Sequence, residues 1–239
     1  MTTALIIAAV FTAALLQSLS GFGFAVIIMP LITFIVGLRV AAPMVALAAL
    51  TVYAINVVRY RRAINYREVL RLGIASALGV PLGTWALTSL NEAVVMRIMG
   101  LLLIAYAIYA LVRPTTSWVL SRYWVYPAGF FSGCLTGAYN APGPPVIVYG
   151  SLRQWPMDEF RAVLQAIFFL NGVMVVVSHL LAQRVTVDVL VLYVCALPAL
   201  ALGIVVGSRV DRFVDRDRFR TFVTVMILGL GLALLLGAR

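Results

Sequence analysis

The most constraining feature of the sequence is a series of long stretches without a charged residue. Examples are residues 41–58, 163–183 and 189–208, each 18 or more residues long. A helix needs about 20 apolar residues to cross the hydrocarbon core of a bilayer. Because 64% of the 239 residues are apolar and only 11% are charged, a water-soluble fold of this size could not bury the apolar surface. The sequence therefore predicts an all-α polytopic membrane protein.

Apolar runs bounded by charge, proline or glycine divide the chain into eight segments. They cover residues 4–37, 40–58, 68–89, 93–112, 123–152, 162–182, 187–208 and 219–237. The first has no basic region before it and no cleavage pattern leading into a polar sequence, so we expect it to be a retained part of the fold. The first and fifth segments are too long for one span. Each is interrupted, by Ser20-Gly21-Phe22-Gly23 or by the run from Gly137 to Pro145, and is expected to form two short helices, broken or re-entrant.

The two halves of the chain resemble each other in order. Leu19-Ser20-Gly21 aligns with Leu135-Thr136-Gly137, and the segment from Leu78 to Thr84 aligns with that from Leu202 to Ser208. The alternative is that any two apolar, glycine-rich helices look alike. We interpret the match as a duplication with repeats at 1–113 and 122–239 and a linker at 114–121. Each repeat begins with a broken helix pair and continues with three transmembrane helices.

The arginines test the topology, because cytoplasmic loops carry the excess of positive residues. All 18 basic residues are arginine, and membrane topology explains them better than nucleic acid binding. Eight simple spans distribute them evenly. If both long segments are hairpins, one side of the membrane holds fourteen arginines. The other side holds four, which are Arg39, Arg97, Arg184 and Arg239. This scheme inverts the second repeat relative to the first and places both termini outside the cytoplasm, in a bacterial-type inner membrane.

The two breaks are the candidate solute sites, since irregular backbone at membrane depth must line a cavity or be buried in protein. We expect a short helix to begin after Ser20 in one and after Asn140 in the other, each acting as a capping residue. Free N–H groups and the positive end of the helix dipole would then favour an anion. The alternative is that the breaks are kinks filled by neighbouring side chains. The candidate binding residues are Gln17, Ser20, Gly21, Phe22, Gly23, Thr136, Gly137, Tyr139, Asn140, Pro142, Gly143 and Pro144.

Other residues have simpler interpretations. The pairs Gly79/Gly83 and Gly203/Gly207 predict close-packing helix faces, and the two cysteines are expected to be packing residues. Two further polar groups remain open between solute contact and helix packing, Gln165 and Asn171. The one histidine, His179, is interpreted as interfacial, with a proton relay as the alternative. Every carboxylate lies in or beside a predicted loop, so a buried carboxylate relay has no candidate.

No motif of an ATPase, a zinc protease or a serine hydrolase is present, so no catalytic residue, cofactor or metal ligand is expected. The expected partners are a small anionic solute and the lipid bilayer, without nucleic acid. The sequence does not identify a coupling ion, and it leaves the oligomeric state open between a monomer and a homodimer.

The sequence resembles the TauE/SafE group of sulfite exporter-like permeases. The resemblance is carried by SGFGFAVIIMPLI near the N-terminus, by GFFSGCLTGAYNAPGPPVIVYG at the start of the second half, and by LGVPLGT and LGIVVGS. The spacing of glycines and prolines from Gly133 to Pro145 is its most specific part. The family motif covers Gly21, Gly23, Pro30, Gly137, Asn140, Pro142, Gly143, Pro144 and Pro145. The resemblance implies transport of a small sulfur-containing anion such as sulfite or an organosulfonate. A channel-like anion pore and an accessory subunit without transport remain the alternatives.

Overall fold

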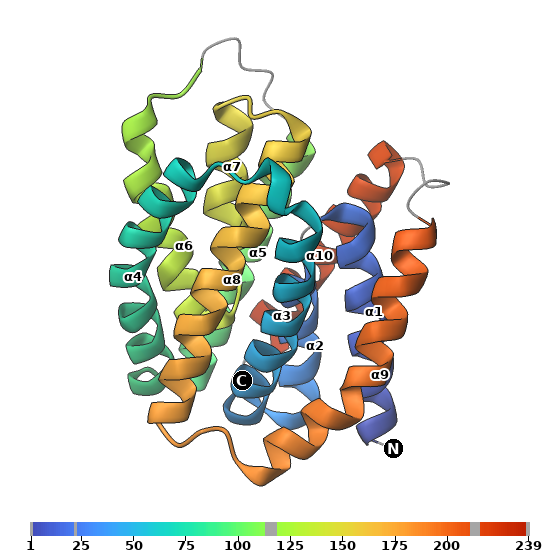
Figure 1. Cartoon of the computed structure of the whole chain (residues 1–239). Coiled ribbons are helices and arrows are strands. Elements are labelled where there is room, and N and C mark those ends of the chain that lie inside the picture. Colours follow the sequence, from blue (N-terminus) through green and yellow to red (C-terminus); the bar gives the residue numbers. More distant parts are fainter. Residues whose placement is uncertain (1, 22, 113–118, 211–215, 238–239) are drawn as a thin grey trace. The chain divides into compact units, whose positions relative to one another are not determined.

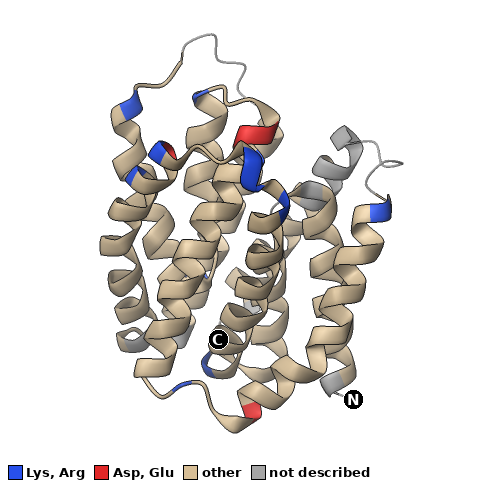
Figure 2. Cartoon of the chain, viewed as in Figure 1, with Lys and Arg blue, Asp and Glu red and all other residues tan. Residues whose placement is uncertain are grey.

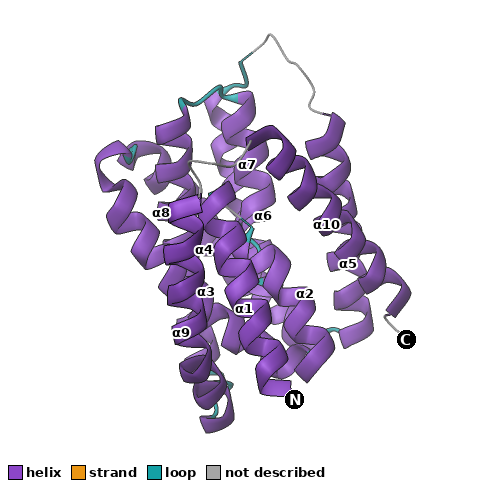
Figure 3. Ribbon diagram, turned by 90° about the vertical axis from the view of Figure 1, so that its right-hand side faces the viewer, coloured by secondary structure: helices purple, strands orange, loops and turns teal. Residues whose placement is uncertain are grey.

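The computed structural model describes residues 2–21, 23–112, 119–210 and 216–237. Within these ranges the chain forms α-helices and two short 3-10 helices, and no strand (Figure 1; Figure 3). The α-helices are α1 (Thr2–Ser20), α2 (Phe24–Val36), α3 (Leu38–Tyr60), α4 (Tyr66–Ser89), α5 (Glu92–Val112), α6 (Val125–Tyr139), α7 (Gly143–Leu152), α8 (Met157–Leu181), α9 (Val187–Val210) and α10 (Arg216–Gly237). The 3-10 helices are η1 (Arg61–Ala63) and η2 (Arg122–Trp124). The all-helical prediction is confirmed.

Both long segments are divided in two, as predicted. The first forms α1 and α2, and the fifth forms α6 and α7, of 15 and 10 residues. At 1.5 Å per residue these last two helices are about 22 and 15 Å long, short of the roughly 30 Å core of a bilayer. Five other helices in the described part of the chain, α3, α4, α5, α8 and α9, are long and apolar enough to cross a membrane.

Helix α4 shows how these helices meet lipid. Its large exposed side chains recur about every fourth residue, which places them on one face of the helix. The exposed face consists of Tyr66, Leu70, Ile74, Leu78, Leu82 and Trp85. The opposite face buries Leu72, Ser76 and Val80. An apolar outer face and a buried inner face that includes a hydroxyl are the arrangement expected of a helix whose solvent is hydrocarbon.

The helices pack into two compact units. Unit 1 comprises Met1–Val45, Ser89–Pro114 and Thr186–Arg239, with α1 packed on α9, α5 on α10, and α2 against α1. Glycines permit the closest approaches. A Cβ atom at Gly203 would lie 2.6 Å from the Phe11 carbonyl oxygen, and one at Gly207 would lie 2.8 Å from that of Leu15.

Unit 2 comprises Ala46–Thr88 and Thr115–Val185. In this unit the backbones of α4 and α6 touch through glycines on both sides. A Cβ atom at Gly79 or Gly83 would collide with the carbonyl of Phe130 or Cys134 in α6. Three glycines of α6 face α4 in the same way, Gly129, Gly133 and Gly137. Small residues let transmembrane helices approach closely, so the predicted packing role of both glycine pairs is confirmed.

The order of elements repeats along the chain. Helices α1 to α5 and α6 to α10 each begin with two short helices around a break and continue with three longer ones. The close packing repeats as well. In unit 1 the glycine pair of α9 lies on α1, and in unit 2 the pair of α4 lies on α6. Each unit thus combines helices from both predicted repeats. The repeat boundaries and the inversion of one repeat stay predictions.

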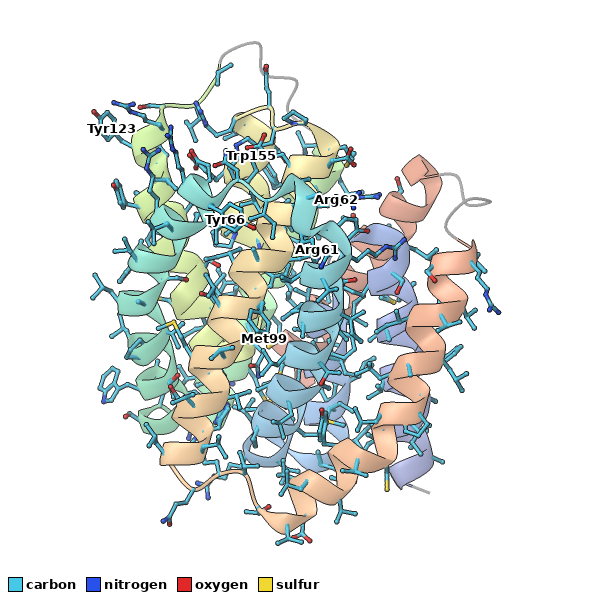
Figure 4. All side chains as sticks on the ribbon, in the orientation of Figure 1. Arg61, Arg62, Tyr66, Met99, Tyr123 and Trp155 are labelled. Atoms are coloured by element: carbon cyan, nitrogen blue, oxygen red, sulfur yellow. The ribbon has the colours of Figure 1, made fainter. Side chains whose placement is uncertain are left out.

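The arginines of unit 2 gather at one of its ends, as Figure 2 shows. They lie at the C-terminus of α3, in η1 and η2, at the start of α4 and α8, and after α7. Hydrogen bonds join these segments, from Asn65 Nδ2 to Glu159 Oε1 at 2.7 Å and from Arg153 Nη1 to the Leu120 carbonyl at 2.9 Å. Figure 4 labels Arg61, Arg62 and Trp155 at this end. Among the described arginines of unit 2, only Arg184 lies at the opposite end, just after the C-terminus of α8.

Candidate functional site

The first break, in unit 1, is organised by the side chain of Gln17. This glutamine is 1% exposed, and its Oε1 accepts a hydrogen bond of 2.8 Å from the N–H of Phe24, the first residue of α2. The Gly21 N–H donates to the Gln17 carbonyl at 2.8 Å. Gln17 therefore binds one of the N–H groups that the start of a helix leaves without an intrahelical partner.

Helix α2 begins differently from the expectation. Its N-cap is Gly23, with φ 101°, and this residue makes no side-chain cap. The predicted capping residue, Ser20, instead ends α1, so the capping prediction is wrong here. Gly21, with φ 77°, and Gly23 have left-handed backbones that favour glycine, which explains the pattern Gly-x-Gly. Phe22 lies outside the described residues.

The start of α2 still offers backbone donors. The first hydrogen bond within this helix runs from the Ile27 N–H to the Gly23 carbonyl at 3.0 Å. The N–H groups of Ala25 and Val26 precede that bond, so the helix itself supplies them with no acceptor. Together with the positive end of the helix dipole they form a donor set suited to an anion.

The second break, in unit 2, starts with Asn140. This residue has φ 55° and is the C-cap of α6, with its N–H donating to the Thr136 carbonyl at 2.8 Å. The Ala141 N–H turns back to the Leu135 carbonyl at 3.3 Å. The prediction that Asn140 caps the following helix is therefore wrong. Asparagine tolerates the left-handed conformation that ends many helices, and here it closes α6 instead.

Helix α7 begins with few backbone donors. Its N-cap is Pro142, without a side-chain cap, and Pro144 and Pro145 occupy its first turn. The four residues from the N-cap onward would normally offer N–H groups, but proline has none. Gly143 is therefore the one residue among these four that carries an N–H group.

Buried side chains form a hydrogen-bond network around the second break. The Ser132 hydroxyl donates to the Pro142 carbonyl at 2.8 Å, and the Thr136 hydroxyl donates to the Ser132 carbonyl at 2.6 Å. Asn171 of α8 donates through Nδ2 to the Ser132 Oγ at 3.3 Å and to the Thr136 Oγ1 at 3.2 Å. All three side chains belong to buried residues. The result is a buried polar network that joins α6, the break and α8.

The other residues predicted for this break have structural surroundings that the sequence did not reveal. A Cβ atom at Gly137 would collide with the Val80 carbonyl and lie 2.6 Å from the Thr84 nitrogen, so this glycine is required for helix packing. Tyr139 is the last residue of α6 and is buried, as is Gly143. The structure thus brings Thr136 into the network and assigns Gly137 to the contact with α4.

The far end of α7 is held by a carboxylate. The Tyr149 hydroxyl donates to the Glu68 Oε2 at 3.1 Å, and the Arg71 Nη1 lies 3.7 Å from the Glu68 Oε1. Glu68 is in the first turn of α4 and is only 6% exposed. Its position beside a predicted loop gave no sign of burial. The indication that the sequence did contain was the pairing of an acidic residue with Arg71, three residues further on.

Three polar residues that the sequence left open, Gln165, His179 and Asn171, have different surroundings. Gln165 accepts from Asn56 Nδ2 at 3.2 Å, which is a bond between helices α3 and α8. His179 is 1% exposed, and neither ring nitrogen has a hydrogen-bond partner among the described residues. Asn171 was left open by the sequence, and the structure places it in the network of the second break. Its signal was weak because only the folded chain brings α8 beside α6.

Comparison with known proteins gives one result that covers almost the entire chain. No curated protein and no solved structure matches the sequence significantly. The family described as sulfite exporter TauE/SafE matches residues 6–234, a range that includes both breaks and both glycine pairs. Its members are membrane transporters of small anions and not enzymes. The chain therefore belongs to the sulfite exporter TauE/SafE family, as a multi-pass membrane protein.

Proposed function

We propose that this protein is a secondary carrier for a small oxyanion, sulfite or an organosulfonate, and that each break, at the start of α2 in unit 1 and at the start of α7 in unit 2, is a position at which the anion binds. Membership of the transporter family over residues 6–234 carries the proposal. The breaks are favoured as binding positions because discontinuous helices at membrane depth present helix ends to solutes in many transporters.

The start of α2 supports binding through its backbone. The Ala25 and Val26 N–H groups have no acceptor within the helix, and the Gln17 Oε1 fixes the neighbouring Phe24 N–H at 2.8 Å. A bound oxyanion would accept from the two remaining groups and lie at the positive end of the helix dipole. Gln17 acts here as a positioning residue, and the backbone of α2 is the anion ligand.

The second break differs from the first because buried side chains give it most of its polarity. Only Gly143 offers an N–H group in the first turn of α7, so the hydroxyl and amide groups of Ser132, Thr136 and Asn171 define the polarity of this break. Because these residues are buried, their interactions with a solute would be screened little by water.

The arginine-rich end of unit 2 is proposed to face the cytoplasm of a bacterial-type inner membrane, with both termini on the other side. The positive-inside rule supports this orientation, because arginines near the ends of spans set the topology.

The decisive experiment measures uptake of labelled sulfite, of methanesulfonate and of a neutral solute into proteoliposomes that contain only the purified protein. We expect saturable flux of the sulfur anions and counterflow when unlabelled anion is placed inside. Flux without saturation would indicate a pore. No flux of any anion would refute the transport proposal for the isolated chain.

A matched pair of variants tests the location of the site. Thr136→Val and Thr84→Val remove hydroxyls that make the same bond, each to the carbonyl four residues earlier, at 2.6 and 2.9 Å. Only Thr136 belongs to the break. We expect Thr136→Val to lower the apparent affinity for the anion by about tenfold and Thr84→Val to leave it unchanged. Equal effects would remove the reason for placing a site at the second break.

A further inference from the structure

The second break contains one buried acceptor that the protein itself does not satisfy. Asn171 is fully buried, and its Oδ1 has no hydrogen-bond partner in the described part of the chain. Its Nδ2, by contrast, has two partners. A buried polar atom without a partner is costly and uncommon in native proteins, so this oxygen requires an explanation.

The orientation of the Asn171 amide follows from the hydroxyl protons around it. The Ser132 hydroxyl lies 2.8 Å from the Pro142 carbonyl and the Thr136 hydroxyl lies 2.6 Å from the Ser132 carbonyl. Carbonyl oxygens only accept, so both hydroxyl protons are committed to them. Toward Asn171 the two hydroxyls can therefore act only as acceptors. The NH₂ group must face them, and Oδ1 must be the atom that remains.

An acceptor in this position is unfavourable for a bare oxyanion. Two oxygen lone pairs facing each other repel, and the proline-rich start of α7 offers a single N–H, that of Gly143, in compensation. An anion that carries its own O–H or N–H would remove the conflict. Its donor would satisfy Asn171 Oδ1 while its charged oxygens face Gly143 and the positive end of α7.

We propose that the second break selects anions that carry a hydrogen-bond donor, and that Asn171 Oδ1 recognises that donor. The substrate class is a singly protonated oxyanion, such as hydrogen sulfite, or a sulfonate with a hydroxyl or amino group. This inference rests on the proposed transport of oxyanions. It adds the protonation state of the transported anion and the residue that recognises its donor.

The test compares pairs of anions that differ in the donor. The first pair is hydrogen sulfite and chlorate, both pyramidal monoanions, of which chlorate has no proton. The second pair is 2-hydroxyethanesulfonate and ethanesulfonate. Each competes with labelled sulfite for uptake into proteoliposomes at mildly acidic pH. We expect the donor-bearing member to compete at least about tenfold better, because a site built around an acceptor rejects an analogue that leaves it unpaired.

Two variants connect this preference to Asn171. Asn171→Leu is expected to reduce both preferences to within about twofold, because the acceptor is gone. Asn56→Leu removes a buried amide elsewhere in unit 2 and should leave the preferences intact. If Asn171→Leu does not insert, the wild-type ratios alone still decide.

The outcomes separate this inference from the transport proposal. Absence of flux for every anion refutes the transport function. Flux with equal competition within both pairs leaves transport standing and refutes the role of Asn171. A sodium dependence that disappears in Asn171→Leu, without any preference for donor-bearing anions, would assign the oxygen to a cation and also overturn the inference.

Discussion

Gly83 offers the sharpest test of how unit 2 is held together. A Cβ atom at this position would lie 2.8 Å from the carbonyl carbon of Cys134 and 3.0 Å from the nitrogen of Ala138. Ordinary contacts between such atoms are about 3.5 Å or more. Both obstacles are backbone atoms, which cannot move without α6, so Gly83→Ala must push the two helices apart by several tenths of an ångström to about 1 Å.

The matched control is Gly73→Ala in the same helix. Its Cβ would lie 3.5 Å from Leu170 Cδ1 and 3.9 Å from Ile167 Cδ1, both ordinary contacts with flexible side-chain ends. We expect Gly83→Ala to destabilise the protein by about 1 to 3 kcal/mol, as overpacking does. Gly73→Ala should be neutral or stabilising by up to about 1 kcal/mol, because alanine favours a helix.

The assay is the loss of monodisperse protein on size-exclusion chromatography after heating in detergent. Gly83→Ala should lose the folded peak at a lower temperature than the wild type, and Gly73→Ala should not. Equal melting of all three proteins would show that α4 and α6 are not in backbone contact, and would refute the packing described for unit 2.

Three further predictions follow from particular contacts. Gln17→Leu leaves the buried Phe24 N–H without an acceptor and should cost about 1 to 3 kcal/mol of stability in the same assay. The control, Thr12→Ala at an exposed site, should be neutral. A neutral Gln17→Leu would show that Gln17 does not cap α2. Tyr149→Phe and Glu68→Ala each remove a partner of the same 3.1 Å bond, so their effects on melting should be less than additive in the double variant, and full additivity would contradict that bond. In a background with Cys134→Ala and Cys195→Ala, an impermeant maleimide should label Arg184→Cys in intact cells but Arg62→Cys only after lysis; the opposite pattern would reverse the proposed orientation.

The spans and breaks were predictable because each depends on local composition. Charge-free stretches such as residues 189–208 appear as α9 (Val187–Val210), and lipid imposes this correspondence since backbone groups have no other partner there. The two interruptions were equally clear, since glycine and proline weaken helices wherever they stand. The glycine pair of α4 was also predictable as a packing face, because two small residues four positions apart lie on the same side of a helix. The sequence did not name the partner helix.

The details of the breaks were not predictable because they depend on competing local options. Asn140 precedes a proline-led helix, so its sequence fits an N-cap, but it also follows a helix and adopts the left-handed conformation at φ 55°. Only the backbone path decides between these roles. The contact of Asn171 with Thr136 joins residues 35 positions apart. A periodic pattern within one helix carries no information about such a pairing.

The second break is held in place on both sides by contacts with α4, and this affects how it can bind a solute. On one side α6 is fixed to α4 by backbone contacts at Gly133 and Gly137. On the other side the end of α7 is tied to α4 through Tyr149 and Glu68. Because the same helix, α4, holds both ends, the groups in the break have little freedom to rearrange when a solute arrives. Groups held in place before binding lose little entropy on binding. A site of this kind would discriminate between anions by where their donors lie, which is the property that the comparison of hydrogen sulfite with chlorate measures.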